Sequence, residues 1–286
     1  MSPARIGIVT DSSSQITRDL VERFDVEVVP MTVTIDGVDH LEGENLDADT
    51  FYGAFADGAT PDIATAQPSP GRFVEAYAAM TDRGYDHIVS IHVSASMSGT
   101  VGSAELAARS ARIPVTVIDS GSASFGLAVC VWAAGVAVAR GANVDDIRRR
   151  VEQLTPRIAT AFMIGVPHLT ERSGRATEID LGDDDGIQVL TMVAGRLDAL
   201  QRVSTIEDTV DVMSGFVIDR VSAAGVAATV AIGTADTASR PLSDRLARAL
   251  AGVDGIDDIV RYRVGPSIGA HTGPGTFGLF VFPSIT

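Results

Sequence analysis

The sequence predicts an α/β protein with two domains, an N-terminal α/β domain built on a parallel sheet and a C-terminal α+β domain with a mixed sheet. In the first half of the chain, short β-branched runs alternate with helical patterns, which is typical of βαβ units. After the Thr155-Pro156 break, paired strands are mixed with helices instead. We therefore place the domains at residues 1–155 and 156–286.

The helix that follows Ser69 is the best defined element of the first domain. Ser69 is a good N-cap and Pro70 suits the first helical position. Phe73, Tyr77 and Met80 then recur at helical spacing. An alanine- and valine-rich run also predicts a buried helix rather than a membrane span; that helix covers residues 123–139. Strands of this domain are predicted at residues 6–9, 26–35, 88–93 and 115–118, with a turn at Asp36-Gly37.

The second domain is predicted to contain a hairpin, because strand-like residues 187–203 are interrupted by Ala194-Gly195-Arg196. A helix is predicted over residues 241–250. The remaining strands are expected at residues 158–164, 227–232, 259–264 and 277–282.

The chain is strongly acidic, with a formal net charge of −15 and an isoelectric point of about 4.6. Such a surface repels phosphate groups, so neither nucleic acids nor anionic membranes are expected partners. The single cysteine, Cys130, cannot form an internal disulfide and is expected to be a small buried hydrophobe. Because the N-terminus enters a strand pattern without a signal-peptide pattern, we expect a soluble, cytoplasmic protein.

Hydroxyl-rich segments follow three strands of the first domain, at residues 10–14, 94–100 and 120–124. Ligands of open parallel sheets bind outside the carboxyl ends of the strands, where hydroxyls and helix N-termini can hold an anion. Helix N-caps account for some of these serines. They do not explain three clusters at one sheet edge, or the polar segment Thr65-Ala-Gln-Pro-Ser69 before a helix that Ser69 already caps. We therefore expect an anion site at this edge.

His271 lies in the run Gly265-Pro-Ser-Ile-Gly-Ala-His-Thr-Gly-Pro-Gly-Thr-Phe-Gly278. Glycine permits close backbone approaches, so this run predicts a backbone shaped around a ligand that His271 faces. The alternative is an irregular surface loop with an incidental histidine. Arg172 and Arg175 are also spaced to reach an anion, whereas the acidic run Asp183-Asp-Asp185 is interpreted as a solvated loop rather than a metal site.

Six segments, spread over the whole chain, resemble the DegV family of bacterial fatty-acid-binding proteins. They are Val9-Thr-Asp-Ser-Ser13, Thr65-Ala-Gln-Pro-Ser69, Ser94-Ala-Ser-Met-Ser-Gly-Thr100, Val117-Ile-Asp-Ser120, Leu169-Thr-Glu-Arg-Ser-Gly-Arg175 and Gly265-Pro-Ser-Ile-Gly-Ala-His-Thr-Gly-Pro-Gly275.

The resemblance implies a carrier that holds one long-chain acyl group, such as palmitate, in an apolar tunnel between its two domains. It implies no cofactor and no catalytic residue, but a partner kinase that converts the presented carboxylate to an acyl phosphate. Thr65 and Ser94 would bind the carboxylate, with Ser98 and Gly99 beside them. Arg175, His271 and Thr272 would line the polar mouth of the site.

This chain departs from the family pattern at three places. Ala95 replaces the second serine of a usual Ser-Ser pair, and Arg202-Val-Ser-Thr205 lacks one basic residue of the family segment. The segment Asp180-Leu-Gly-Asp-Asp-Asp-Gly186 replaces part of a longer stretch. The short segment predicts a shallower lid over the acyl chain.

Two other functions stay open. The chain could be a serine hydrolase, or an acyl or phosphoryl transferase, that uses Ser94 or Ser98 with His271; a triad would also need an acid to orient the histidine. It could instead be a regulatory protein in which a bound lipid is only structural.

Overall fold

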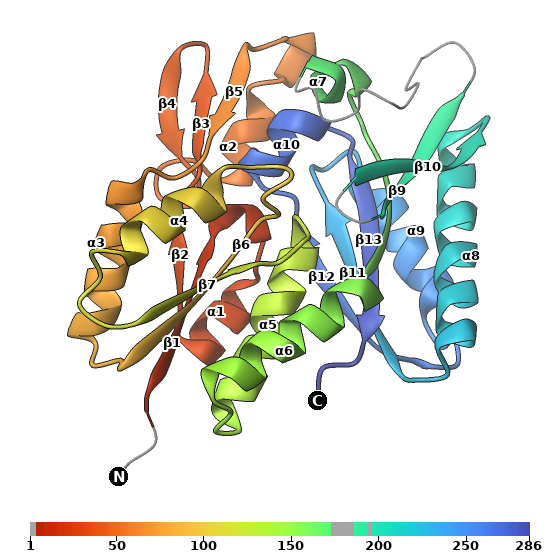
Figure 1. Ribbon diagram of the computed structural model, residues 1–286. Coiled ribbons are helices and arrows are strands. Elements are labelled where there is room, and N and C mark those ends of the chain that lie inside the picture. Colours follow the sequence, from red (N-terminus) through yellow and green to blue (C-terminus); the bar gives the residue numbers. More distant parts are fainter. Residues whose placement is uncertain (1–3, 173–185, 194–195) are drawn as a thin grey trace. The chain divides into compact units, whose positions relative to one another are not determined.

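The computed structural model describes residues 4–172, 186–193 and 196–286 (Figure 1). The chain forms two compact units, the first composed of residues 1–45, 64–156 and 285–286 and the second of residues 46–63 and 157–284. The chain therefore passes between the units more than once. That residues 1–155 and 156–286 each fold as an independent domain stays a prediction.

The first unit contains the predicted parallel sheet. Its strand order is β2-β1-β6-β7, and every neighbouring pair is parallel. Its helices pack on both faces of this sheet, with α3 and α4 on one face and α1 and α5 on the other. The strands are β1 (Ile6–Asp11), β2 (Val26–Val29), β6 (His87–His92) and β7 (Val115–Asp119). The helices are α1 (Arg18–Phe24), α3 (Pro70–Asp82), α4 (Thr100–Ala108), α5 (Phe125–Ala139) and α6 (Val144–Leu154).

The single strand predicted at residues 26–35 is wrong, because the structure has two strands there. Pro30 separates β2 from β3 (Thr32–Ile35), and proline has no N–H to continue a strand ladder. The two strands then join different sheets, since β3 belongs to a three-stranded sheet of order β4-β3-β5. The predicted turn at Asp36 and Gly37 is confirmed, as both residues have positive φ. The other strands of the small sheet are β4 (Val38–Leu41) and β5 (Ile63–Ala66).

The core of the first unit follows the predicted patterns. Phe73, Tyr77 and Met80 of α3 are buried against the sheet. The alanine-rich helix α5 is buried along most of its length, and it contains Cys130. Burial raises the pKa of the Cys130 thiol to about 12, which agrees with its predicted role as a buried hydrophobe. Within the described residues, no helix is both long enough and apolar enough to cross a membrane.

The second unit is built on a mixed sheet of order β10-β9-β8-β13-β11-β12. Neighbouring strands are antiparallel except β11 and β12, which are parallel. β9 and β10 form the predicted hairpin. The strands are β8 (Ala159–Met163), β9 (Ile187–Val193), β10 (Arg196–Val203), β11 (Ala228–Thr234), β12 (Ile256–Arg263) and β13 (Phe277–Pro283).

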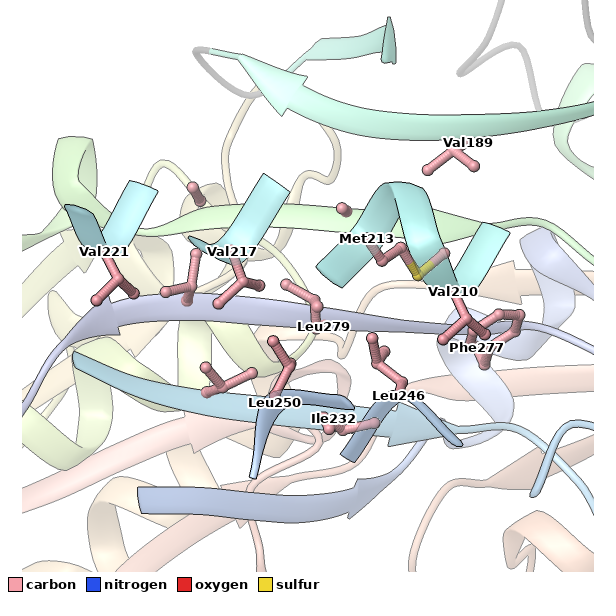
Figure 2. Close-up of a cluster of buried hydrophobic side chains, with 14 of the residues drawn as sticks. Val189, Val210, Met213, Val217, Val221, Ile232, Leu246, Leu250, Phe277 and Leu279 are labelled. Carbon is pink, nitrogen blue, oxygen red and sulfur yellow. The ribbon is translucent and has the colours of Figure 1, made fainter. Parts of the chain in front are cut away.

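No element is predicted between residues 203 and 227, where the structure forms helix α8 (Ile206–Ala224), which covers this sheet. Thr205 and Asp208 form a capping box at its start. Its side chains Val210, Met213 and Val217 recur at helical spacing and pack on β13 and β8 together with α9 (Arg240–Leu250), as Figure 2 shows. The capping box and the apolar spacing are both visible in the sequence.

The remaining elements of the described residues are short. The helices are α2 (Ala48–Gly53), α7 (Pro167–Arg172) and α10 (Pro266–Thr272), and the 3-10 turns are η1 (Ser12–Ser14), η2 (Ala56–Gly58) and η3 (Thr155–Arg157).

We predict opposite effects of alanine at two glycines of the second unit. A Cβ on Gly165 would lie 1.8 Å from the backbone oxygen of Pro274, so Gly165→Ala should lower the free energy of unfolding by about 3 kcal/mol. A Cβ on Gly215 of α8 meets nothing within 4 Å. Gly215→Ala should therefore stabilise the protein by about 0.5–1 kcal/mol, as a helix interior prefers alanine. Urea denaturation measures both values, and equal effects of the two substitutions would contradict this account.

Candidate functional site

The carboxyl ends of β1, β6 and β7 lie next to one another at one edge of the parallel sheet (Figure 1). The hydroxyl-rich segments at residues 10–14, 94–100 and 120–124 start at these ends, as predicted. Two of them lead directly into helices, since α4 begins at Thr100 and α5 at Phe125. Hydroxyls and helix N-termini are therefore collected at the edge where open parallel sheets bind their ligands.

The carboxylate of Asp11, at the end of β1, joins the first of these segments to the second. Asp11 is fully buried. Its Oδ2 lies 3.0 Å from Nδ1 of His92 and accepts a hydrogen bond from the backbone N–H of Val93 at 3.1 Å. Its Oδ1 accepts from the backbone N–H of Ser13 at 3.2 Å and from the Ser13 hydroxyl. These partners compensate the cost of burying a charge, and they fix the point where the chain leaves β6.

His92 extends this contact into the core of the first unit. Its Nε2 lies 2.6 Å from Oγ of Ser90, and that oxygen lies 3.0 Å from the hydroxyl of Tyr77. His92 and Ser90 are 0% exposed and Tyr77 is 1% exposed. Burial raises the pKa of Tyr77 to about 12, so its hydroxyl keeps its proton. His92 and Ser90 were not predicted as functional residues; the available signal was two polar residues in a buried strand, where polar groups need partners.

The second and third hydroxyl-rich segments are joined in a similar way. The backbone N–H of Ser94 donates to the carbonyl of Ser122 at 2.8 Å. The carboxylate of Asp119, at the end of β7, accepts from the backbone N–H of Ala95 at 3.2 Å and from that of Gly121 at 2.8 Å. Asp119 therefore holds the β6–α4 segment from one side, while Asp11 holds it from the other.

The segment between β6 and α4 contains Ser94, Ser98 and Gly99, three of the predicted site residues. Oγ of Ser94 lies 2.9 Å from Oγ of Ser96, and Oγ of Ser98 lies 2.8 Å from Oγ1 of Thr100. The Ser94–Ser96 pair uses one of its two protons, so the other can be donated to a ligand. In the second pair, the Thr100 hydroxyl donates to Sδ of Met31 at 4.0 Å, so the Ser98 hydroxyl donates to Thr100. Gly99 is the N-cap of α4 and supplies no side-chain cap. The arrangement offers hydroxyl and backbone donors to an anion.

The Thr65–Ser69 segment reaches the same helix start. Thr65 is half-buried on β5, two residues before Gln67. The side-chain amide of Gln67 lies against Gly99, since a Cβ there would be 2.5 Å from its Oε1. Nε2 of Gln67 also donates to Oγ of Ser103 in α4 at 3.4 Å. Two neighbouring segments of the first unit thus carry four predicted site residues: Thr65, Ser94, Ser98 and Gly99.

His271 and Thr272 belong to the second unit, in the last turn of α10. His271 is half-buried, and its carbonyl accepts a hydrogen bond from the hydroxyl of Thr170. The Thr272 hydroxyl donates to the carbonyl of Ile268 at 3.2 Å, so its proton already has an acceptor within the helix. Arg175 and the Asp183–Asp185 run lie outside the described residues. The pairing of Ser94 or Ser98 with His271 would join the two units, and it stays a prediction.

Two of the glycines around His271 pack closely within the second unit. A Cβ on Gly269 would lie 2.6 Å from the hydroxyl oxygen of Tyr52 in α2. Gly273 has a φ of +76°, and a Cβ there would lie 2.5 Å from Cβ of Val166. Residues 266–272 of this run form a helix packed against α2 and α7, so the alternative of an irregular surface loop is wrong, while a ligand at His271 stays a prediction.

Ser267 was not among the predicted residues, although Gly265-Pro-Ser-Ile-Gly269 has the Gly-x-Ser-x-Gly spacing of a nucleophile elbow. Such an elbow exposes its serine on a strained turn between a strand and a helix. Ser267 instead lies inside α10, is 3% exposed and does not have a positive φ. The structure therefore does not form an elbow at this serine. Over residues 4–172, 186–193 and 196–286, no group of three or more His, Cys, Asp or Glu side chains could hold a metal ion.

Comparison with known sequences identifies relatives along nearly the whole chain. The model of the DegV family, described as an uncharacterised protein family, matches residues 5–284. A DegV domain-containing protein of Streptomyces coelicolor is 32% identical over 279 residues, which cover 96% of this chain and 98% of that protein. A similarly described protein of Mycobacterium tuberculosis is 30% identical over 279 residues, with 96% of both chains covered.

Solved structures of the same family share this fold. A DegV family protein of Thermus thermophilus, described as binding a fatty acid, is 27% identical, with a TM-score of 0.89 over 98% of this chain and 100% of that one. DegV of Bacillus subtilis, described as a fatty acid binding protein, has a TM-score of 0.87 with the same coverage. At 21% identity, that second likeness shows the fold alone. The predicted α/β class, with one parallel and one mixed sheet, is confirmed.

We predict that Asp119→Ala leaves the backbone N–H groups of Ala95 and Gly121 without their carboxylate acceptor. The amides of Ala95 and Gly121 should exchange their hydrogens faster, because both lose a charged acceptor. The loss of these exposed hydrogen bonds should cost about 1 kcal/mol of stability. Hydrogen exchange followed by NMR measures each amide separately. Unchanged exchange at both amides would show that Asp119 does not hold the segment.

Proposed function

Because this chain belongs to the DegV family, we propose that it binds a long-chain fatty acid through hydroxyls at the carboxyl edge of its parallel sheet. The observation that carries the proposal is the segment between β6 and α4, whose paired hydroxyls precede a helix N-terminus. The relative from Thermus thermophilus, described as binding a fatty acid, supports the same class of ligand over the full length of the chain.

In this proposal, neutral donors hold the carboxylate. The hydroxyls of Thr65 and Ser94 donate to its oxygens, with Ser98 and the backbone at Gly99 beside them. Hydrogen bonds to an ionised acceptor are stronger than bonds between neutral groups, so a few hydroxyls suffice. The N-terminus of α4 adds its positive dipole end.

His271, Thr272 and Arg175 are proposed to form the polar mouth of the site. Arg175 would supply a fixed positive charge and His271 a ring N–H. Thr272 would contribute as an acceptor, because its proton is donated to Ile268. These roles require the second unit to face the carboxylate.

The acyl chain is proposed to lie in an apolar tunnel between the domains at residues 1–155 and 156–286. Burial of a palmitate-sized chain, at about 0.8 kcal/mol for each CH₂, contributes on the order of 10 kcal/mol before ordering costs. Most of the affinity would therefore come from the chain, while the hydroxyls select the carboxylate end.

We further propose that the protein is a carrier, without a cofactor, that presents the bound carboxylate to a partner fatty-acid kinase in the cytoplasm. The alternative is a serine hydrolase or transferase that uses Ser94 or Ser98 with His271. Mass spectrometry of the protein purified without added lipid separates the two functions. An intact, stoichiometric fatty acid supports the carrier, whereas an acyl-serine adduct, or turnover of nitrophenyl palmitate, supports the enzyme.

We predict that Thr65→Ala and Ser94→Ala each weaken palmitate binding by about 1.5–3 kcal/mol, roughly tenfold to a hundredfold in Kd. Each substitution removes one donor to the carboxylate. Ser110→Ala is the matched control, because this hydroxyl beyond the other end of α4 donates to the carbonyl of Ala107. Calorimetry with delipidated protein measures the three affinities. If both site variants bind as tightly as the control, the carboxylate lies elsewhere.

The tunnel predicts a steep dependence of affinity on chain length. Each pair of methylenes removed from the ligand should weaken binding by roughly tenfold, because every buried CH₂ contributes about 0.8 kcal/mol. Long chains should also raise Tm by mass action, since they bind only the folded protein. Saturated acids of eight to eighteen carbons, titrated in parallel, test this, and a flat profile would exclude an enclosing tunnel.

A further inference from the structure

We infer that Asp11 and His92 are positioning residues that hold the segment after β6 in the geometry that lets Ser94 bind a carboxylate. The inference rests on the proposed function of Ser94. It is carried by the buried chain of hydrogen-bonded groups that runs from Tyr77 through Ser90 and His92 to Asp11, which we term the buried relay.

The proton donors of the buried relay can all point toward Asp11. An ionised carboxylate only accepts, so Nδ1 of His92 carries the proton shared with Oδ2. In the neutral ring, Nε2 then accepts from the Ser90 hydroxyl, and Oγ of Ser90 accepts from Tyr77. Tyr77 has a second acceptor, the carbonyl of Ala104, but at the longer distance of 3.4 Å. Each of the three side chains gives one proton, and no buried donor is left over.

The relay has the order of groups of a serine-hydrolase triad, yet its burial excludes that chemistry. A catalytic serine must reach the substrate, with its histidine acting as the base. The oxygen of Ser90 is enclosed with the whole residue, which is 0% exposed, and its neighbours in the relay are Tyr77 and His92. We therefore assign the relay a structural task and not a catalytic one.

That task follows from the two hydrogen bonds that share one oxygen. Oδ2 of Asp11 accepts from His92 Nδ1–H and also from the backbone N–H of Val93, the residue immediately before Ser94. The ring of His92 is held in turn by Phe73, whose ring meets it edge-on at 4.9 Å between centroids. With the carboxylate held by His92, Val93 is kept in place, and the direction in which the chain reaches Ser94 is set. Loss of the Nδ1 donor would leave Oδ2 held only by the N–H of Val93, while Oδ1 stays bonded to Ser13, so the positions of Oδ2 and of Val93 would be less fixed.

Three substitutions of histidine on β6 test this inference. His92→Leu removes both ring nitrogens, whereas His92→Asn keeps an N–H close to the position of Nδ1. His87→Leu is the matched control, the same change at the other end of the strand, where Nε2 lies 2.9 Å from Oγ1 of Thr116. We expect His92→Leu to weaken palmitate binding by about tenfold or more, the worth of one hydrogen bond to a charged group. His92→Asn should stay within about threefold of the unsubstituted protein, and His87→Leu should be unchanged.

A second measurement reads the segment without any ligand. Amide NMR shifts and hydrogen exchange at Val93, Ser94 and Ala95 should change in His92→Leu and stay near the native values in His92→Asn and His87→Leu. If His92 only stabilised the fold, fully folded His92→Leu and His92→Asn would show the same amide shifts and exchange rates at these residues. If His92→Leu does not fold, His92→Gln replaces it, because the longer amide places its N–H nearer the position of Nε2 and should not rescue Val93.

The outcomes separate this inference from the proposed function. If the unsubstituted protein binds no palmitate, the proposed function fails, and the amide measurement still decides the role of the relay. If palmitate binds and His92→Leu binds it equally well, or if the amides of residues 93–95 are unaffected by that substitution, the positioning role is overturned. Loss of affinity that His92→Asn restores, with matching changes in the amides, supports it.

Discussion

The carboxylate of Asp11 accepts four hydrogen bonds at the carboxyl edge of the parallel sheet, and none of its surface reaches solvent. A buried charge without such partners would cost several kcal/mol, so the residues that supply the donors are held where they are. Two of these donors come from His92, the last residue of β6, and from Val93 directly after it, which lie 81 and 82 residues further along the chain. The frame of the candidate site depends on this contact, because it sets the start of the segment that carries Ser94.

The polar atoms that build this frame differ from those that are proposed to bind the ligand. The hydroxyl of Ser12 is used by Glu42 and by the N–H of Met31, and that of Thr10 by the carbonyl of Ile91. In the β6–α4 segment, the hydroxyls of Ser94 and Ser96 are bonded to each other, and this pair keeps one proton to donate. Of the three hydroxyl-rich segments, the one after β1 therefore builds the edge, and the one after β6 is suited to recognise an anion.

This division suits the ligand class of the family. A chain with a net charge of −15 has little need of a strong cationic site if the acyl chain supplies most of the binding free energy. In the proposed function, neutral hydroxyls would identify the carboxylate without holding it so tightly that it could not be passed on. In the second unit, close packing of Gly269 on α2 and of Gly273 on Val166 gives α10 a rigid position, so that His271 is placed by the protein itself.

The sequence by itself determined the elements whose signals are local. The Ser69-Pro70 start and the apolar spacing of Phe73, Tyr77 and Met80 defined α3, and alternating strand and helix patterns defined the class. Even α8, which was missed, has its capping box and apolar spacing in the sequence. Only the tertiary structure decided that β2 and β3 join different sheets, that Gly269 and Gly273 near His271 are closely packed, and that His92 and Asp11 meet. These depend on contacts between residues far apart in the chain, and hydrogen bonding and close approach at such distances in sequence leave no local pattern to read.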